Sequence, residues 1–426
     1  MRELPVEAVV LADVALVLAL SALMVRLFRR WSQPPVVAEI AAGLMLGPTV
    51  LGLLPGDLPS VVFPPEARMP LSAIAQLGLA LFMFMAGWEL DLHRLRGSGR
   101  ALGGLAVLSM VVPFCFGAAA ALLLYDTQAA PGVDKQAFVL FLATAFSITA
   151  FPVLARVIRD RGLSGTRIGS MAMACAAICD VIAWCVLVLV IAAAGAGGTD
   201  AFATVVALTL AYSAVMALVV APLLHRALLR PVRHENRGIV LVLITVGVLL
   251  SSLATSWIGV HALFGAFAFG LVMPRQRQNE GNLGHVVAAP LESATSLLLP
   301  VFFVVTGLNV DVSTLGWSGV ATLAFVLVVA VAGKFAGAML PARLLRMDWR
   351  DAGTFGALMN TRGLTEIIVL GIGRQLGLVS PALFTVMVLM ALVTTAMVGP
   401  LLRLRRAEKA QHERPITPVA HPALRE

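Results

Sequence analysis

The sequence predicts an all-α polytopic membrane protein with thirteen transmembrane helices, built as two inverted six-helix repeats that each contain one broken crossing helix. Three observations lead to this prediction: the composition, a series of long apolar segments and a similarity between the two halves of the chain. Of the 426 residues, 59% are hydrophobic and 13% are charged, and the mean hydropathy is +0.94. Because a soluble domain carries about 25% charged residues, this composition excludes a water-soluble globule.

The helices are predicted from segment length, since a hydrocarbon core about 30 Å thick requires about 20 apolar residues per helix. Thirteen segments meet this requirement. Their approximate limits are 6–27, 34–54, 70–90, 101–125, 137–158, 168–195, 201–224, 238–255, 257–273, 288–310, 317–343, 351–373 and 381–404. The transmembrane domain is expected to span 1–406, with repeat one at 6–195, a linker helix at 201–224, repeat two at 238–404 and a short disordered cytoplasmic tail at 407–426.

Orientation follows from the basic residues, which cytoplasmic loops retain. Of the 31 Lys and Arg residues, 25 lie on one side of the predicted spans and four on the other, while Lys334 and Arg362 lie within spans. The N-terminus is therefore expected outside and the C-terminus in the cytoplasm, in a multi-pass protein of the cell (inner) membrane. The same pattern explains the net charge of +8 without nucleic acid as a partner.

The two halves of the chain share a segment. Residues 77–92 align without gaps on residues 297–312, in the third predicted helix of each repeat. The identical pairs are Leu77/Leu297, Leu79/Leu299, Phe82/Phe302, Gly87/Gly307 and Asp91/Asp311. Because the repeats begin on opposite sides of the membrane, common ancestry implies inverted topology, which is typical of secondary transporters.

Each repeat also contains one candidate interruption, in its fifth helix. In the first repeat Pro152 follows a polar stretch and lacks a backbone donor. In the second, the sequence Asn360-Thr361-Arg362-Gly363 is polar and flexible. Unwound backbone at this depth survives where it lines a cavity or packs within protein, and its freed ends can face an ion. The alternative interpretation is a simple proline kink and an ordinary glycine.

A charge at the membrane midplane costs about 2.5–3.5 kcal/mol on insertion scales, so each ionisable residue there requires a reason. Asp180 lies near the middle of the sixth helix. A lone carboxylate in that position can hold a proton or a desolvated cation, and an exchanger requires this competition. The alternative is a permanently protonated, structural aspartic acid.

The remaining intramembrane charges have expected partners. Lys334 should pair with a carboxylate or lose its proton, and Asp180 is the expected partner when no cation is bound; a fixed structural ion pair is the alternative. Arg362 and Glu366, four residues apart, are expected to hold together the crossover that the interrupted segment 351–373 forms. Structural hydrogen-bonded roles are expected for the semi-buried residues Glu39, Glu89, Glu292 and His261.

Six ordered blocks of the chain carry a resemblance to a known family. They are 34–52 (PPVVAEIAAGLMLGPTVLG), 77–91, 145–163 (AFSITAFPVLARVIRDRGL), 259–274 (GVHALFGAFAFGLVMP), 299–311 and 358–373 (LMNTRGLTEIIVLGIG). With these blocks the chain resembles, from about residue 11 to residue 402, the monovalent cation:proton antiporter-2 family, within the larger cation/proton antiporter superfamily.

The resemblance implies a sodium/proton antiporter-like fold and an elevator mechanism, in which a core domain of helices 4–6 and 11–13 moves against a dimerisation domain. It also implies site roles: Asp180 as the residue that binds the cation or proton, Thr149 as a ligand and Lys334 as the charge-compensating lysine. Family members carry an Asn-Asp or Asp-Asp pair that falls on Cys179 and Asp180. Cys179 departs from this pattern, since Na⁺ and K⁺ prefer oxygen ligands, and electrogenic exchange is therefore in doubt.

These observations predict a secondary transporter, and not an enzyme, that exchanges Na⁺ or K⁺ for H⁺. Asp180 is the expected metal ligand, and Pro152, Asn360, Thr361, Arg362 and Glu366 are expected to support the crossover. The expected partners are the two ions, the lipid bilayer and a second copy of the chain, with no cofactor. Two alternatives remain: a channel-like K⁺ efflux protein, and a transport-inactive membrane sensor or accessory subunit.

Overall fold

The computed structural model describes residues 5–31, 33–90, 99–191, 199–228, 237–274, 284–308, 310–312 and 315–412, and this part of the chain is helical. The first nine helices are α1 (Val6–Phe28), α2 (Pro35–Leu46), α3 (Leu58–Val62), α4 (Pro65–Glu89), α5 (Gly99–Gln128), α6 (Lys135–Ser147), α7 (Phe151–Asp160), α8 (Arg167–Ile191) and α9 (Thr199–Val215). The others are α10 (Ala221–Leu228), α11 (Arg237–Ile258), α12 (Ala262–Val272), α13 (Ala289–Leu308), α14 (Trp317–Lys334), α15 (Leu340–Leu344), α16 (Trp349–Met359), α17 (Leu364–Gln375) and α18 (Pro381–His412).

Ten helical segments in the described part of the chain are long and apolar enough to cross a membrane. They include the pair α6 and α7, which together form one such segment, and the α14–α15 segment, which contains a π-helical turn at Phe335–Met339. The other predicted spans fall on α8, on the shorter apolar helix α12 and on the pair α16 and α17. The protein is therefore a helical, multi-pass membrane protein.

Several helix limits differ from the prediction. The second span was expected to continue to 54, but α2 ends at Leu46, before the proline at 48. Gly259, with φ of 96°, places the turn between α11 and α12 later than expected. The tail was expected to be disordered from 407, but α18 continues to His412. Residues 413–426, like residues 91 and 92 of the aligned segment, lie outside the described part.

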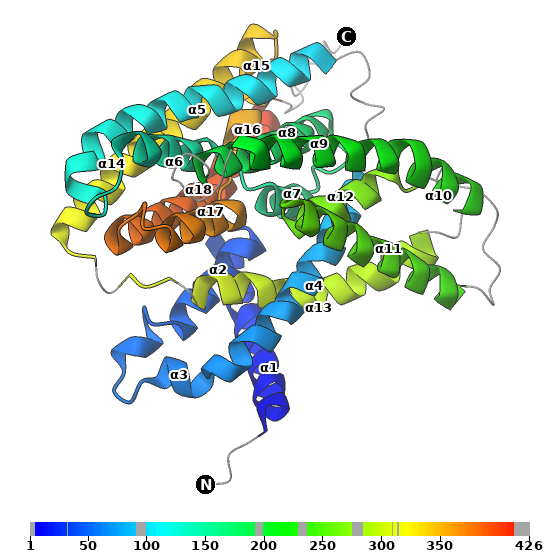
Figure 1. Ribbon diagram of the computed structural model, residues 1–426, viewed down its shortest axis with the longest axis horizontal. Coiled ribbons are helices and arrows are strands. Elements are labelled where there is room, and N and C mark those ends of the chain that lie inside the picture. The colour runs from blue at the N-terminus through cyan, green and yellow to red at the C-terminus, as the bar shows by residue number, and fades with distance from the viewer. Residues whose placement is uncertain are drawn as a thin grey trace, which may run out of the picture.

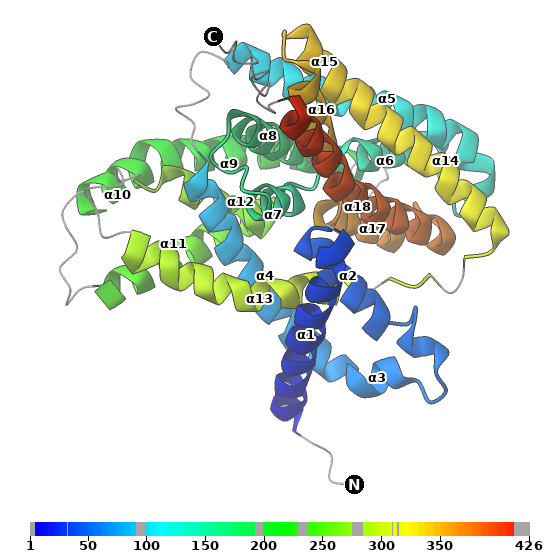
Figure 2. The ribbon, with the colours of Figure 1, turned by 180° about the vertical axis from the view of Figure 1, so that it is seen from behind.

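The helices form two groups, which we call layer one and layer two. Layer one consists of α1, α2, α4, α11, α12 and α13, and layer two consists of α5–α8 and α14–α18. Figure 1 shows layer two in the upper part of the molecule and α1, α2, α4 and α13 of layer one below it, and the reverse view in Figure 2 shows the same division. Few helix pairs join the layers, chiefly α7 with α2 and α18 with α2. α9 contacts α8 on one side and α11 on the other.

Close packing in layer one depends on glycines, because residues without a side chain let helix backbones approach each other closely. On α13, a Cβ at Gly307 would overlap the carbonyl oxygen of Ile40 on α2 and lie 2.8 Å from the Cα of Gly43. On α4, a Cβ at Gly87 would overlap the carbonyl oxygen of Phe267 on α12. Gly87 and Gly307, which are paired in the alignment of residues 77–92 on 297–312, therefore both lie at close helix contacts: Gly307 where α13 packs on α2, and Gly87 where α4 packs on α12.

Both predicted interruptions are present in layer two. α6 ends at Ser147 and α7 begins at Phe151, while α16 ends at Met359 and α17 begins at Leu364. Pro152 lies in the first turn of α7, where a missing backbone donor costs no helical hydrogen bond. The chain is thus unwound just before the proline, and each crossing helix contributes two half-helices that point their ends toward the centre of layer two.

We predict that Gly307→Ala destabilises the protein, because the added methyl group has to displace the α2 backbone. Overpacking of this kind costs about 1–3 kcal/mol. Gly104→Ala on α5 is the matched control, since a Cβ there meets nothing within 4 Å and alanine favours a helix. Thermal unfolding of the purified protein in detergent should show a lower midpoint for Gly307→Ala alone. Equal midpoints for the two variants would contradict the packing argument.

Candidate ion-binding site

The two unwound segments meet at the centre of layer two. The backbone N–H of Ala150 donates to the carbonyl of Thr361 at 3.0 Å, which joins them directly. Gly363 has φ of 152°, a conformation that side chains rarely adopt, and a Cβ there would lie 2.8 Å from Cγ2 of Val153. Asn360 is fully buried in the second segment, and neither polar atom of its amide has a hydrogen-bond partner.

Asp180 on α8 lies beside the beginnings of both second half-helices. Its Oδ2 accepts from the backbone N–H of Phe151, the first residue of α7, at 3.3 Å. The same oxygen accepts from the hydroxyl of Thr365, in the first turn of α17, at 3.4 Å. Its Oδ1 is buried and has no hydrogen-bond partner. The carboxylate therefore faces two helix N-termini, the positive ends of the helix dipoles.

A small cavity adjoins this carboxylate at the boundary between the layers. Layer two contributes Phe151, Pro152, Asp180 and Thr365 to its lining. The opposite wall comes from the start of α12 in layer one, with His261, Leu263 and Phe264. The cavity volume is about 10 Å³, which is about the minimum for one water molecule. Asp180 itself is 2% exposed, so little solvent reaches it in this conformation.

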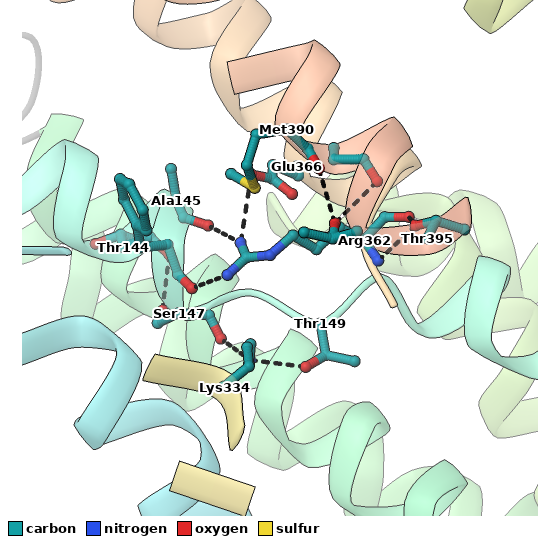
Figure 3. A network of polar contacts seen from close by, with 12 residues as sticks. Thr144, Ala145, Ser147, Thr149, Lys334, Arg362, Glu366, Met390 and Thr395 are labelled. Atoms are coloured by element: carbon teal, nitrogen blue, oxygen red, sulfur yellow. Dashed lines mark hydrogen bonds and ion pairs between the residues drawn. The ribbon is translucent and has the colours of Figure 1, made fainter. Parts of the chain in front are cut away.

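Lys334, at the end of α14, is fully buried and uses its ammonium group to bind oxygen atoms at the opposite side of the crossover. Its Nζ donates to the carbonyl of Ser147 at 2.6 Å and to the hydroxyl of Thr149 at 2.8 Å. The Thr149 hydroxyl in turn donates to the carbonyl of Met359 at 2.9 Å. Ser147 and Met359 are the last residues of α6 and α16, so Lys334 contacts the C-terminus of α6 directly, as Figure 3 shows, and is joined to that of α16 through the Thr149 hydroxyl.

The third hydrogen bond of Lys334 depends on a proline. Nζ donates to the carbonyl of Ser109 on α5 at 3.2 Å. Within a helix this carbonyl would accept from the N–H four residues later, but that residue is Pro113, which has none. The proline therefore frees an acceptor in the membrane interior, and the lysine occupies it.

Arg362, also fully buried, caps the same end of α6. Its Nη1 donates to the carbonyl of Ala145 at 3.1 Å and its Nη2 to the carbonyl of Phe146 at 2.6 Å (Figure 3). Nη1 also lies 3.4 Å from Oε1 of Glu366, so the expected pair at the interruption between α16 and α17 is formed. Thr395 on α18 holds the backbone of Arg362: its hydroxyl accepts from the N–H at 2.9 Å and donates to the carbonyl at 2.5 Å.

These contacts correct one expectation about the site. The predicted pairing of Lys334 with Asp180 is absent, because the three donors of the ammonium group go to Ser109, Ser147 and Thr149. At the break in the crossing helices, the lysine lies at the C-terminus of α6 and the aspartate at the N-termini of α7 and α17. Thr149 is located with the lysine: its hydroxyl accepts from Nζ and donates to Met359, and no hydrogen bond joins it to Asp180.

Cys179 points away from the carboxylate that follows it. Its Sγ lies 3.4 Å from the carbonyl of Ala106 and 3.5 Å from the hydroxyl of Ser109, both on α5. The thiol is thus part of the packing between α8 and α5. Among the described residues it makes no hydrogen bond with Asp180.

Helix ends explain how these charges are tolerated. A charge at the midplane costs about 2.5–3.5 kcal/mol, whereas one helix end contributes up to about 2 kcal/mol in a partly buried position. One helix end therefore offsets part of this cost, and a second end offsets more of it. Asp180 faces the N-termini of α7 and α17, while Lys334 contacts the C-terminus of α6 and two further oxygen atoms.

Sequence reasoning missed three contributors to the site. Thr365, Ser109 and Thr395 are ordinary hydroxyl residues in apolar helices, and such residues usually bond to their own helix. Two signals were available: Thr365 follows Gly363 in the predicted interruption, and Ser109 precedes Pro113 by four residues. Nothing in the sequence distinguishes Thr395 from its neighbour Thr394.

Four residues were expected to be semi-buried with structural hydrogen-bonded roles; the structure buries Glu39 and exposes Glu89 and Glu292, and each of the four contacts a neighbouring group. Glu39 on α2 lies 3.9 Å from Arg156 on α7. Glu89 on α4 and Glu292 on α13 both pair with Arg159 on α7, at 3.4 and 2.5 Å. His261 begins α12, and its Nδ1 accepts from the N–H of Leu263 at 3.4 Å. All of the carboxylates belong to layer one and both arginines to layer two.

A helical membrane protein with two unwound crossing segments and a buried carboxylate between half-helices has the architecture of a secondary transporter. A family model described as the transmembrane part of sodium/hydrogen exchangers matches residues 16–404. The Na⁺/H⁺ antiporter NhaS4 of Synechocystis sp. is 36% identical over 402 residues, with 92% of this chain and 96% of that protein covered. This chain therefore belongs to the sodium/hydrogen exchanger family, a family of monovalent cation/proton antiporters.

Other relatives agree with this assignment. Cation/H⁺ antiporter 20 of Arabidopsis thaliana is 37% identical, and K⁺/H⁺ antiporter 1 of Saccharomyces cerevisiae is 33% identical. The alignments cover 92% and 88% of this chain but 47% and 44% of those proteins, so the chain spans about half their length. The solved structure of the sodium/proton antiporter MjNhaP1 from Methanocaldococcus jannaschii superimposes with a TM-score of 0.62 at 13% identity, covering 93% of this chain and 98% of that one. This likeness shows a shared fold.

We predict that Thr395→Val destabilises the crossover, because it leaves the backbone N–H of Arg362 buried and unpaired. Such a loss costs about 1–3 kcal/mol. Thr394→Val is the matched control: Thr394 is equally buried, but its hydroxyl donates only to carbonyls of its own helix. The thermal unfolding midpoint should fall clearly further for Thr395→Val than for Thr394→Val, and Thr395→Ser, which keeps the hydroxyl, should unfold close to the wild-type midpoint. A Thr394→Val effect as large as that of Thr395→Val would exclude the bridging role.

Proposed function

We propose that this protein is a secondary active transporter that exchanges Na⁺ or K⁺ for H⁺ across the cell membrane, with Asp180 occupied alternately by the proton and the cation. The observation that carries this proposal is the position of a buried carboxylate, with one oxygen free of protein partners, at the N-termini of two half-helices. The names of the relatives, which include Na⁺/H⁺ and K⁺/H⁺ antiporters, support the same activity.

Competition at one carboxylate is sufficient to couple the two ions. A buried carboxylate without a compensating positive charge is costly, so Asp180 is expected to hold either a proton or a cation while it is away from water. The helix N-termini reduce this cost without removing it. Because the neighbouring residue is Cys179, the site has a single acidic group, which favours exchange of one cation for one proton.

The role of Lys334 is then structural compensation rather than direct neutralisation of Asp180. The Lys334 cation is bonded to the C-terminal end of α6 and, through the Thr149 hydroxyl, joined to that of α16, which keeps those ends in register while their partners α7 and α17 face the aspartate. Pro152, Asn360, Thr361, Arg362 and Glu366 belong to the same crossover. We include Thr149 here as a support residue for Lys334.

The transport motion that we propose is an elevator movement of layer two against layer one, with α9 and α10 as the linker. Two features support it: the cavity beside Asp180 lies at the boundary between the layers, and the ion pairs between them come from one end of α7. Each layer moves as a unit only if its own packing is firm. The glycine contacts of layer one and the crossover of layer two meet this condition.

The finer architecture is part of the proposal. We propose thirteen crossings, two inverted repeats at 6–195 and 238–404, an outer N-terminus, a cytoplasmic C-terminus and a homodimer in the lipid bilayer. The equivalent contacts of Gly87 and Gly307 support the repeats. The excess of Lys and Arg in alternate loops supports the orientation.

We predict that Asp180→Asn abolishes exchange while the protein remains folded, because the amide cannot bind and release a proton. Asp13→Asn is the matched control, since Asp13 is similarly buried, in α1 of layer one. The measurement is the signal of a pH-sensitive dye in proteoliposomes on addition of Na⁺ or K⁺. Exchange at the wild-type rate in Asp180→Asn would remove this residue from the mechanism. Cation flux at matched pH without proton movement would instead indicate a channel.

We predict that Arg159→Gln changes the concentration of cation that gives half-maximal exchange, because the ion pairs with Glu89 and Glu292 favour the conformation in which the layers are paired at this end. Exposed ion pairs contribute about 0.2–1 kcal/mol each, so losing two of them should change this concentration by about two- to thirtyfold. Arg226→Gln on α10, an exposed arginine, should have no effect. Exchanging the charges, with Arg159→Glu and Glu292→Arg together, should recover part of the change. No difference between Arg159→Gln and Arg226→Gln would refute a conformational role.

A further inference from the structure

Thr365 differs from most other buried threonines of the described helices in the direction of its hydroxyl. Most threonine hydroxyls in the described helices donate to the carbonyl four residues earlier in their own helix. Examples are Thr144 to Leu140, Thr306 to Phe302 and Thr394 to Met390. Thr365 is 4% exposed, and its hydroxyl donates instead to Oδ2 of Asp180 on another helix.

The interruption of the crossing helix explains this difference. Thr365 is the second residue of α17, so four residues before it lies Thr361, in the unwound segment. The carbonyl of Thr361 accepts from Ala150 across the crossover. The Thr365 hydroxyl therefore has no carbonyl of its own helix to bond, and it is directed toward the carboxylate.

The hydroxyl at this position can serve every state of the carboxylate. It donates to Asp180 when that group is ionised, and it can accept from Asp180 when that group is protonated. Its lone pairs are also available to a hard monovalent cation, which prefers oxygen ligands. The distance of 3.4 Å to Oδ2 is longer than that of a strong hydrogen bond to a carboxylate, about 2.5–2.7 Å, so the two oxygens are not locked together.

The two other candidate ligands, Cys179 and Thr149, make their contacts with groups other than Asp180. The thiol of Cys179 packs on α5. The hydroxyl of Thr149 accepts from Lys334 and donates to Met359. Of these three side chains, Thr365 alone shares both a hydrogen bond and a cavity with Asp180.

We infer that Thr365 is a cation ligand of this antiporter and supplies, from α17, the oxygen that Cys179 does not supply from α8. This inference rests on the proposed function, because it assigns a ligand to the same site. Since the cavity is about the size of one water molecule, an entering cation must lose most of its hydration shell, and the Thr365 hydroxyl replaces part of that shell. Thr365 then determines how tightly the cation competes with the proton at Asp180.

Thr365→Val tests this inference, because it removes the hydroxyl and keeps the shape. The half-maximal concentration of Na⁺ or K⁺ for exchange in proteoliposomes should rise by at least about tenfold, the usual order for a lost polar contact with a charge. Thr365→Ser should remain within about threefold of the wild type. Thr306→Val, at a buried threonine of layer one that bonds to its own helix, is the control and should match the wild type.

A second measurement separates ion binding from transport. Na⁺ and K⁺ should raise the thermal unfolding midpoint of the purified protein in a concentration-dependent manner. Thr365→Val should shift this dependence to higher concentration, as Asp180→Asn should remove it, while Thr365→Ser and Thr306→Val keep it. If Thr365→Val does not fold, Thr365→Ala takes its place in both measurements.

The outcomes distinguish the two proposals. Wild-type concentration dependence in folded Thr365→Val, with the dependence lost in Asp180→Asn, overturns the role of Thr365 and leaves the proposed function intact. Cation-dependent stabilisation that Thr365→Val weakens, without exchange in the wild type, supports the ligand and overturns the proposed transport. A wild-type protein that neither exchanges nor is stabilised by Na⁺ or K⁺ overturns both.

Discussion

The central constraint on this structure is that ionised groups in the membrane interior must be stabilised by the ends of broken helices. Two crossing helices are interrupted at 148–150 and 360–363, which creates two N-termini and two C-termini at the same depth. Asp180 lies at the two N-termini, and Lys334 and Arg362 both bind carbonyls at the C-terminus of α6. Each charge depends on the unwound backbone, and the unwound backbone depends on the charges for its hydrogen bonds.

This arrangement divides the work between the two ends of the crossover. Beside the C-terminal end of α6, the ammonium group of Lys334 donates to three oxygen atoms and the guanidinium group of Arg362 donates to two carbonyls, so hydrogen bonds hold that region in place. At the N-terminal ends, the hydrogen bonds to Asp180 are long and one of its oxygens has no hydrogen-bond partner, so the carboxylate keeps unused capacity to accept hydrogen bonds or bind an ion. A transporter needs this asymmetry, because a binding site that is already satisfied by protein has no reason to take an ion.

Much of the fold could be predicted from the sequence, because segment length and composition are local properties. The apolar segments, both helix interruptions and the buried positions of Asp180 and Lys334 follow from residues near each other in the chain. Side-chain partners could not be predicted in the same way. Lys334 and Asp180 were expected to pair because they are opposite charges in a low-dielectric region, but the carbonyls at the helix ends and at Ser109 satisfy the lysine instead. These acceptors are backbone atoms, which no residue pattern displays.

The sequence by itself determined that the chain is a helical membrane protein with a carboxylate, Asp180, near the middle of an apolar segment, since a charge in apolar surroundings is evident from the residues around it. It also determined where the helices break, since Pro152 and Gly363 act on their own backbone. Only the tertiary structure decided which groups surround that carboxylate. The direction of the Thr365 hydroxyl, the turn of Cys179 toward α5 and the bridge from Thr395 depend on how helices far apart in the chain are packed, because a hydroxyl or thiol bonds to whichever acceptor that packing brings within reach.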